Sequence, residues 1–143
     1  MLRSMDTDLI LVGLGGFCGA LARYGINNVL AAGYLPWGTI LANVTGSLLL
    51  GFVQVLAMKG VGLGSRFRLV AGVGFCGAYT TFSTFSMESL ELLYNYQLAK
   101  ASLYILGTTG CCLVSVLAGM ALGSLFCNGL EKIGSGHPEQ DRG

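Results

Sequence analysis

The stretch from residue 74 to residue 86, which reads GFCGAYTTFSTFS, carries the side chains best suited to chemistry in this chain. It lies inside an apolar run long enough to cross a bilayer, yet six of its residues bear hydroxyl groups: Tyr79, Thr80, Thr81, Ser83, Thr84 and Ser86. Polar groups and irregular backbone at membrane depth are stable only where protein or a water-filled path satisfies them. The stretch is therefore a candidate site for ion binding or permeation.

The composition indicates an integral membrane protein. Of 143 residues, 53% are hydrophobic and 10% are charged, and the mean hydropathy is +0.69. The chain is therefore too apolar and carries too few charges for a soluble domain of this size. Four apolar segments are each long enough to span a hydrocarbon core of about 30 Å, at residues 9–30, 39–57, 69–93 and 101–127. We expect an all-α, single-domain protein with four transmembrane helices over residues 1–128, followed by a disordered polar tail over residues 129–143.

The third apolar segment is expected to break near its middle. Gly77 is followed closely by the β-branched pair Thr80 and Thr81, and this combination disfavours a helix interior. A break would leave free carbonyl groups on one half-helix, suited to a cation, and free N–H groups on the other, suited to an anion. The alternative is a kink whose hydroxyl groups bond back to the helix.

Two aromatic residues and one amide could line an anion path. Phe82 and Phe85 lie three residues apart and share a helix face. They are either ordinary packing residues or present their ring edges, which carry the positive end of the quadrupole, to an anion. Asn43, deep in the second segment, either supplies a neutral N–H donor to that path or forms a helix-to-helix hydrogen bond.

Charged residues are few within the apolar segments. Arg23 either anchors the first segment at the interface or lines a wet vestibule that concentrates anions. Glu88 and Glu91, near the end of the third segment, are expected to be interfacial or paired with a basic residue. The distribution of Lys and Arg near the segment ends favours a single orientation with both termini inside.

Other function classes lack the residues they need. The only histidine, His137, lies in the tail, and no nucleophile motif, metal-ligand spacing or phosphate-binding loop occurs. The five cysteines lie in apolar runs without a C-x-x-C pair, so we interpret them as packing residues, with a metal or redox site as the alternative. There is no basic surface for nucleic acid. We expect neither an enzyme nor a nucleic-acid-binding protein.

With these residues identified, the chain resembles the small fluoride-specific ion channels, the Fluc or CrcB family, over residues 13–123. The resemblance is carried by G-x-x-x-R-Y at residues 19–24, by the asparagine and glycine of N-V-T-G at residues 43–46, and above all by GFCGAYTTFSTF at residues 74–85. It implies a passive channel in the bacterial inner membrane that lets cytoplasmic fluoride leave the cell and so limits its toxicity. It also implies an antiparallel, dual-topology homodimer in the lipid bilayer, which disagrees with the charge distribution.

The resemblance also implies roles for individual residues. Together with the hydroxyl groups beside the phenylalanines, it gives a fluoride pathway lined by Phe82, Phe85, Asn43, Thr81, Ser83, Tyr104 and Thr108. Arg23 would lie in the vestibule. A structural sodium ion at the dimer centre would be bound by the backbone carbonyls of Gly77 and Thr80. Cys112, a weak donor, occupies one position of the polar track on the fourth segment.

Fluoride suits these residues because a small, strongly hydrated anion needs close donors to replace its water shell. The alternative function is a small dual-topology multidrug or cation exporter, a class of similar length and span count. Such exporters couple transport to protons through a membrane-embedded carboxylate, and the first segment has none. A non-conducting helper of membrane assembly is a third possibility.

Overall fold

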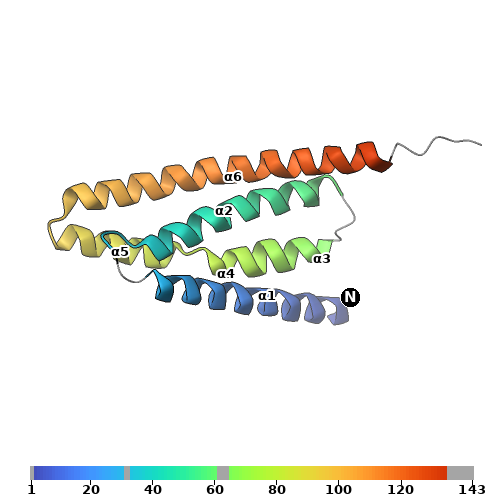
Figure 1. Ribbon diagram of the computed structural model, residues 1–143. Helices are drawn as coiled ribbons and strands as arrows, with labels where there is room; N and C mark the ends of the chain where they lie inside the picture. Colours follow the sequence, from blue (N-terminus) through green and yellow to red (C-terminus); the bar gives the residue numbers. More distant parts are fainter. Residues whose placement is uncertain (1, 31–32, 61–64, 135–143) are drawn as a thin grey trace, which may run out of the picture.

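The computed structural model describes residues 2–30, 33–60 and 65–134, which form helices packed side by side (Figure 1). Three helices are long: α1 (Leu2–Val29), α2 (Trp37–Met58) and α6 (Leu98–Gly134). Each contains a stretch long and apolar enough to cross a bilayer, at Met5–Val29, Trp37–Met58 and Leu98–Lys132. The described residues therefore form an all-helical, multi-pass membrane protein, in agreement with the predicted class.

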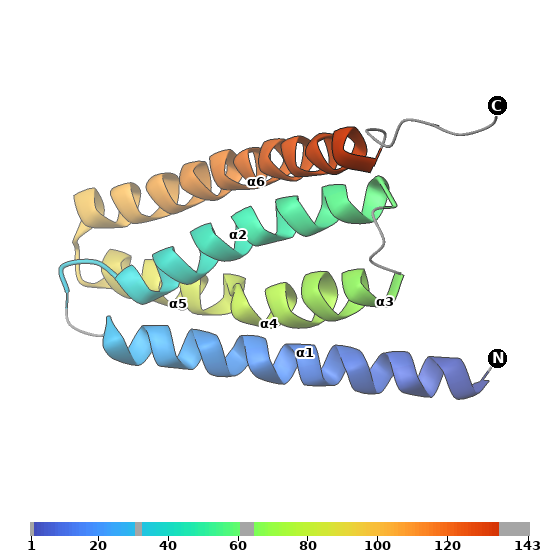
Figure 2. The same cartoon turned by 45° about the vertical axis from the view of Figure 1, so that its right-hand side comes forward.

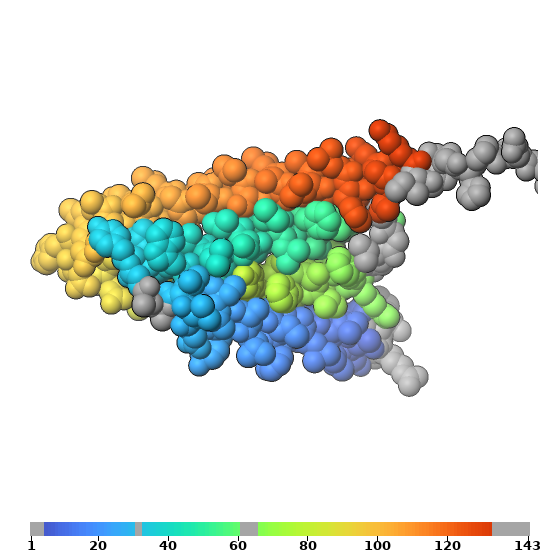
Figure 3. All heavy atoms as spheres, viewed as in Figure 1, coloured from blue at the N-terminus to red at the C-terminus, as the bar shows by residue number. Residues whose placement is uncertain are grey.

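Between α2 and α6 the chain forms shorter pieces that together run the length of the bundle (Figure 2). They are α3 (Ser65–Phe67), the π-helix η1 (Arg68–Cys76), α4 (Gly77–Tyr79) and α5 (Phe82–Tyr94). Successive long segments run in opposite directions, so α1 begins and α6 ends at the same end of the molecule. The space-filling view shows α1 and α6 on opposite flanks, with α2 between them (Figure 3).

Two helix boundaries differ from the expected segments. α1 begins at Leu2 rather than near residue 9, and α6 continues to Gly134, so residues 129–134 are helical rather than a disordered tail. Polar contacts support these extensions: Asp8 pairs with Arg66 at 2.9 Å, and Lys59 Nζ donates to Asn128 Oδ1 at 2.5 Å. A helix can continue past its apolar stretch where polar partners are available. The rest of the expected tail, residues 135–143, lies outside the described residues.

Glycines bring α1 into backbone contact with η1. A Cβ on Gly15 would crowd the Val70 carbonyl, and a Cβ on Gly19 would collide with the carbonyl of Phe75. Small residues at such positions allow the close helix approach that stabilises helix pairs in lipid. The π-helical segment η1 thus packs closely against the glycine face of α1.

The backbone is extended at two residues between α4 and α5. Thr80 has φ −79° and ψ 154°, and Thr81 has φ −148° and ψ 120°. Thr81 also caps α5, because its Oγ1 accepts a hydrogen bond from the Thr84 N–H at 3.2 Å. Threonine is a favoured residue at this position because its oxygen satisfies one of the unpaired N–H groups of the first turn. The interruption lies against α2, which positions the site described next.

Candidate functional site

Asn43 of α2 holds the interruption through both ends of its side-chain amide. Its Nδ2 donates to the Thr81 carbonyl at 3.1 Å, and its Oδ1 accepts from the Thr81 N–H at 2.7 Å. The helix-to-helix bond expected as one alternative is therefore present. An amide NH₂ carries two hydrogens, so one donor of Asn43 is left for a ligand in the adjoining groove.

Two carbonyl groups at the interruption lose their helical donors. In a continuous helix the Thr81 N–H would bond to the Gly77 carbonyl, but it donates to Asn43 instead. The Thr84 N–H, which would bond to the Thr80 carbonyl, donates to Thr81 Oγ1. By contrast, the Cys76 carbonyl accepts both the N–H and the hydroxyl of Thr80. Within the described part of the chain, the carbonyls of Gly77 and Thr80 thus lack their helical donors and are open to a ligand.

A groove of about 430 Å³ runs beside the interruption, between α2, α5 and α6. Its lining contains no charged side chain and consists of Asn43, Ser47, Leu50, Thr80, Thr81, Phe82, Phe85, Thr108, Thr109, Cys112, Leu113 and Val116. Hydroxyl groups, one amide and two phenyl rings therefore gather at one end of the groove, and aliphatic side chains at the other. Such a lining offers donors to an anion without a fixed charge that would trap it.

Thr108 is the most distinctive polar residue of this groove. Its side chain is 4% exposed, and its Oγ1 is buried with no hydrogen-bond partner among the described residues. A buried hydroxyl without a hydrogen-bond partner costs about 1–3 kcal/mol of stability. A ligand in the groove that accepted the hydrogen of the Thr108 hydroxyl would remove this cost.

The two phenylalanines lie together, as their spacing predicts. The ring centroids of Phe82 and Phe85 are 5.9 Å apart, and Phe85 also packs on Tyr104 at 5.1 Å, both pairs being tilted. Tilted rings present edges as well as faces to their neighbours. Phe82 is 79% exposed, whereas Phe85 is half-buried.

A chain of hydroxyl groups marks the start of α5. Thr81 Oγ1 donates to Thr84 Oγ1 at 3.1 Å, so the 3.2 Å contact between Thr81 and Ser83 has Ser83 as the donor. Arg23 Nη1 reaches Thr84 Oγ1 at 3.5 Å, and Arg23 Nε is buried without a partner in the described part of the chain. Arg23 thus points toward the N-terminal end of α5, where the helix dipole is also positive.

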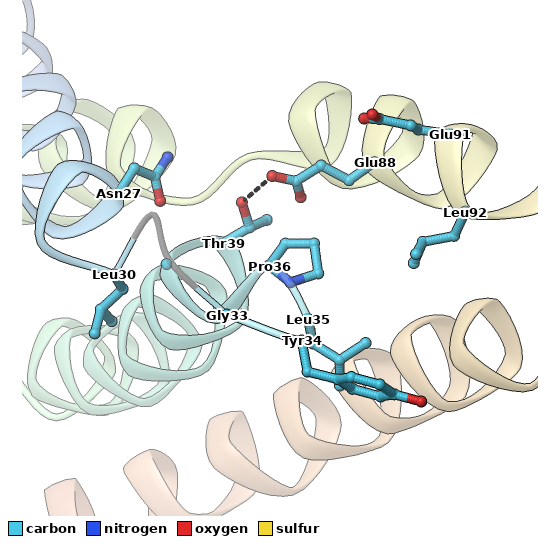
Figure 4. A pocket seen from close by; sticks show the side chains of 11 residues that line it. Asn27, Leu30, Gly33, Tyr34, Leu35, Pro36, Thr39, Glu88, Glu91 and Leu92 are labelled. Carbon is cyan, nitrogen blue, oxygen red and sulfur yellow. Dashed lines mark hydrogen bonds between the residues drawn. The ribbon is translucent and has the colours of Figure 1, made fainter. Parts of the chain in front are cut away.

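Glu88 borders a second cavity of about 430 Å³, which lies near the end of α1 (Figure 4). The carboxylate accepts a hydrogen bond from the Thr39 hydroxyl at 2.9 Å and another from the Tyr104 hydroxyl at 2.6 Å. Of the two expectations for Glu88, an interfacial place or a basic partner, the second is not met among the described residues: no basic side chain pairs with the carboxylate, and two hydroxyl groups bond to it instead. Glu91 also lines this cavity and is exposed.

The groove brings together six of the residues predicted for the site: Asn43, Thr80, Thr81, Phe82, Phe85 and Thr108. Tyr104 does not line it, because its ring packs behind Phe85 and its hydroxyl donates to Glu88. Ser83 is exposed and bonds to Thr81 instead.

Sequence reasoning assigned no role to Thr39 or Thr45, although both bond to residues of the third segment. Thr39 lies one helical turn before Asn43, and that spacing was the available signal.

Long apolar helices and a neutral, donor-lined groove define a multi-pass membrane protein suited to ion transport. The family described as "CrcB-like protein, Camphor Resistance (CrcB)" matches residues 10–120, and the chain belongs to this family.

Several relatives carry the name fluoride-specific ion channel FluC. The one from Trichormus variabilis is 41% identical over 125 residues, covering 85% of this chain and 91% of that protein. The one from Methanocaldococcus jannaschii is 41% identical over 119 residues, covering 82% of this chain and 95% of that protein. The Methylococcus capsulatus protein is 43% identical over 122 residues, and this chain spans only about half of it, since the match covers 82% of this chain and 53% of the relative.

Proposed function

We propose that this chain is a fluoride-selective, passive ion channel that lets cytoplasmic fluoride leave the cell and thereby lowers its toxicity. Membership of the CrcB family and the relatives named as fluoride-specific channels support this function. The structural observation that carries it is the uncharged groove containing the Thr108 hydroxyl, which has no hydrogen-bond partner among the residues that the structure describes. The exporter alternative is not favoured by these comparisons.

The groove replaces water around a small anion with protein donors. The free hydrogen of Asn43 Nδ2, the hydroxyl of Thr108 and the ring edges of Phe82 and Phe85 all border one space. A small ion has the highest charge density and gains most from close contact with such donors, whereas a larger halide fits them poorly. Because no lining side chain is charged, the ion can leave as readily as it enters.

We further propose that the segment from α3 to α5 acts as a single membrane crossing, interrupted at Thr80 and Thr81. The helix end at Tyr79 directs partial negative charge toward the interruption, and the start of α5 directs partial positive charge toward it. Irregular backbone is stable in a membrane only where protein satisfies it, and Asn43 does so here.

The free carbonyls of Gly77 and Thr80 fit a structural sodium ion. Backbone carbonyl oxygens are the donors that hard cations prefer, and these two have lost their helical partners. A bound sodium ion would supply positive charge that holds the ends of the interruption together. A single protomer offers too few such ligands for a complete shell.

A second copy of the chain in antiparallel orientation would complete that shell. A two-fold axis beside Gly77 would bring a second pair of carbonyls to the same ion, as expected for a dual-topology homodimer. Two observations support this arrangement: nothing lies within 4 Å of a Cβ position on Gly77, and the neighbouring Phe82 is exposed in the protomer.

Efflux from liposomes tests the proposed function. Purified protein is reconstituted with a potassium gradient, valinomycin carries the counter-charge, and fluoride and chloride release are compared in one preparation. Rapid fluoride release with chloride retained is the expected result. Release of both ions alike, or of neither, would contradict a selective channel.

A further inference from the structure

Tyr79 is the last residue of α4 and immediately precedes the extended backbone. Its side chain is 8% exposed, and its ring stacks on Phe75 with centroids 5.5 Å apart and planes inclined by 20°. Its hydroxyl lies 2.9 Å from Thr45 Oγ1 on α2. The residue therefore joins the end of the first half-helix to a different element.

The direction of this hydrogen bond follows from the neighbouring contact. Thr45 Oγ1 donates its only hydrogen to the Leu41 carbonyl at 2.6 Å. Tyr79 must therefore donate and Thr45 accept. The hydrogen of the Tyr79 hydroxyl therefore points toward Thr45 Oγ1, and the two hydroxyl groups cannot exchange the roles of donor and acceptor.

One turn of α2 thus contacts both sides of the interruption. Asn43 holds Thr81 on the α5 side, and Thr45 holds Tyr79 on the α4 side. Gly46, which follows Thr45, lies so close to the interruption that a Cβ there would collide with Thr80 Cγ2. The separation of the two half-helices is consequently set by α2 rather than by the two extended residues alone.

We propose that Thr45 and Tyr79 are a positioning pair whose hydrogen bond fixes the end of α4, and with it the carbonyls of Gly77 and Thr80, in the arrangement that a sodium ion requires. This inference rests on the sodium site proposed above. Neither side chain contacts the ion. Their effect is on its affinity, because a loosened α4 end would have to be reordered each time the ion binds.

The test measures sodium affinity in the full-length, reconstituted protein. Tyr79→Phe and Thr45→Val each remove the bond while keeping the shape of the side chain. The thermal unfolding midpoint is followed as sodium replaces a bulky organic cation, since a ligand of the native state raises that midpoint. Fluoride efflux is recorded over the same sodium range. We expect each variant to raise the half-saturating sodium concentration about fivefold.

Further variants separate positioning from general stability. In the double variant the half-saturating sodium concentration is expected to rise no further than in either single variant, because each substitution removes the same bond. Thr45→Ser keeps the hydroxyl and is expected to keep the half-saturating sodium concentration of the wild-type protein. Tyr94→Phe, which removes an exposed tyrosine hydroxyl elsewhere, serves as the matched control. If Thr45→Val does not fold, Tyr79→Phe carries the same test, since it leaves the stacked ring in place.

Three outcomes would overturn the inference in different ways. Lower unfolding temperatures with an unchanged half-saturating sodium concentration would mean that the bond only stabilises the fold. Shifts that add up in the double variant would mean that the residues do not act as a pair. If the wild-type protein conducts fluoride but neither its stability nor its flux responds to sodium, the sodium site itself is wrong, and the positioning role is rejected with it.

Discussion

Asn43 and Thr81 are joined by two hydrogen bonds of opposite direction, one from the amide Nδ2 to the Thr81 carbonyl and one from the Thr81 N–H to the amide Oδ1. A single side chain thereby replaces the helical acceptor that the Thr81 N–H loses at the interruption and adds a donor to the Thr81 carbonyl. Bonding to both the N–H and the carbonyl of one residue requires a side chain that carries a donor and an acceptor side by side, as the amide of asparagine does.

Replacement of Asn43 by aspartate tests this double bond. Asn43→Asp keeps an acceptor for the Thr81 N–H but loses the donor, and it adds a negative charge to a groove proposed for an anion. Losing one hydrogen bond to a buried group costs about 1–3 kcal/mol, so we expect fluoride efflux from liposomes to fall by tenfold or more. Asn95→Asp, at the end of α5, is the control, and similar rates for both variants would contradict the role of Asn43.

Replacement of Thr108 by valine should separate stability from transport. The Thr108 hydroxyl is buried without a partner in the described residues, so removing it is expected to leave the unfolding midpoint unchanged or raise it by the equivalent of up to about 1 kcal/mol. Fluoride efflux is expected to slow, and Thr108→Ser should restore it. A clear loss of stability in Thr108→Val, with unchanged efflux, would show that the hydroxyl serves only the fold.

The aromatic pair provides a third prediction. Phe85→Ile keeps an apolar side chain but removes the ring that packs on Phe82 and Tyr104. We expect a fluoride efflux at least tenfold slower, with the oligomeric state of the purified protein retained. Phe126→Ile, which alters a comparable ring contact with Phe52, is the matched control. Normal efflux in Phe85→Ile would exclude ring edges as a part of the path.

Gly46 offers a test of how closely α2 must approach the interruption. A Cβ at this position would collide with Thr80 and crowd the Tyr79 ring, so Gly46→Ala is expected to displace the half-helix and destabilise the protein by about 1–3 kcal/mol. Gly13→Ala, where nothing lies within 4 Å of the added atom, should raise helix propensity without a clash. Thermal unfolding of both variants measures the difference, and equal stabilities would mean that Thr80 can move aside.

The sequence was most informative where a residue type stands out against its surroundings. An asparagine and a cluster of hydroxyl groups within apolar segments pointed to Asn43 and Thr81, and the family resemblance pointed to Thr108. These three residues do line one groove. The second apolar segment, expected at residues 39–57, agrees closely with α2 (Trp37–Met58), because proline and tryptophan precede the segment and Lys59 and Gly60 follow it closely.

The remaining features depend on partners that local sequence does not name. Thr45 and Thr39 look like ordinary helix threonines until packing brings Tyr79 and Glu88 to them. The π-helical segment η1 packs against glycines of α1 that lie more than fifty residues earlier in the chain. Hydropathy likewise marks the membrane-embedded part of a helix but not its ends, so it missed the last turns of α6.

The length of α6 has a practical consequence for labelling. With 37 residues it extends about 55 Å, well beyond a hydrocarbon layer of about 30 Å, and it ends at the same end of the molecule at which α1 begins. An epitope or fluorescent protein attached before α1 or after α6 would therefore stand clear of the lipid, on one side of the membrane for a given protomer. In an antiparallel pair the labels of the two copies would lie on opposite faces of the membrane. A protease or antibody added outside intact vesicles would then reach half of the labels.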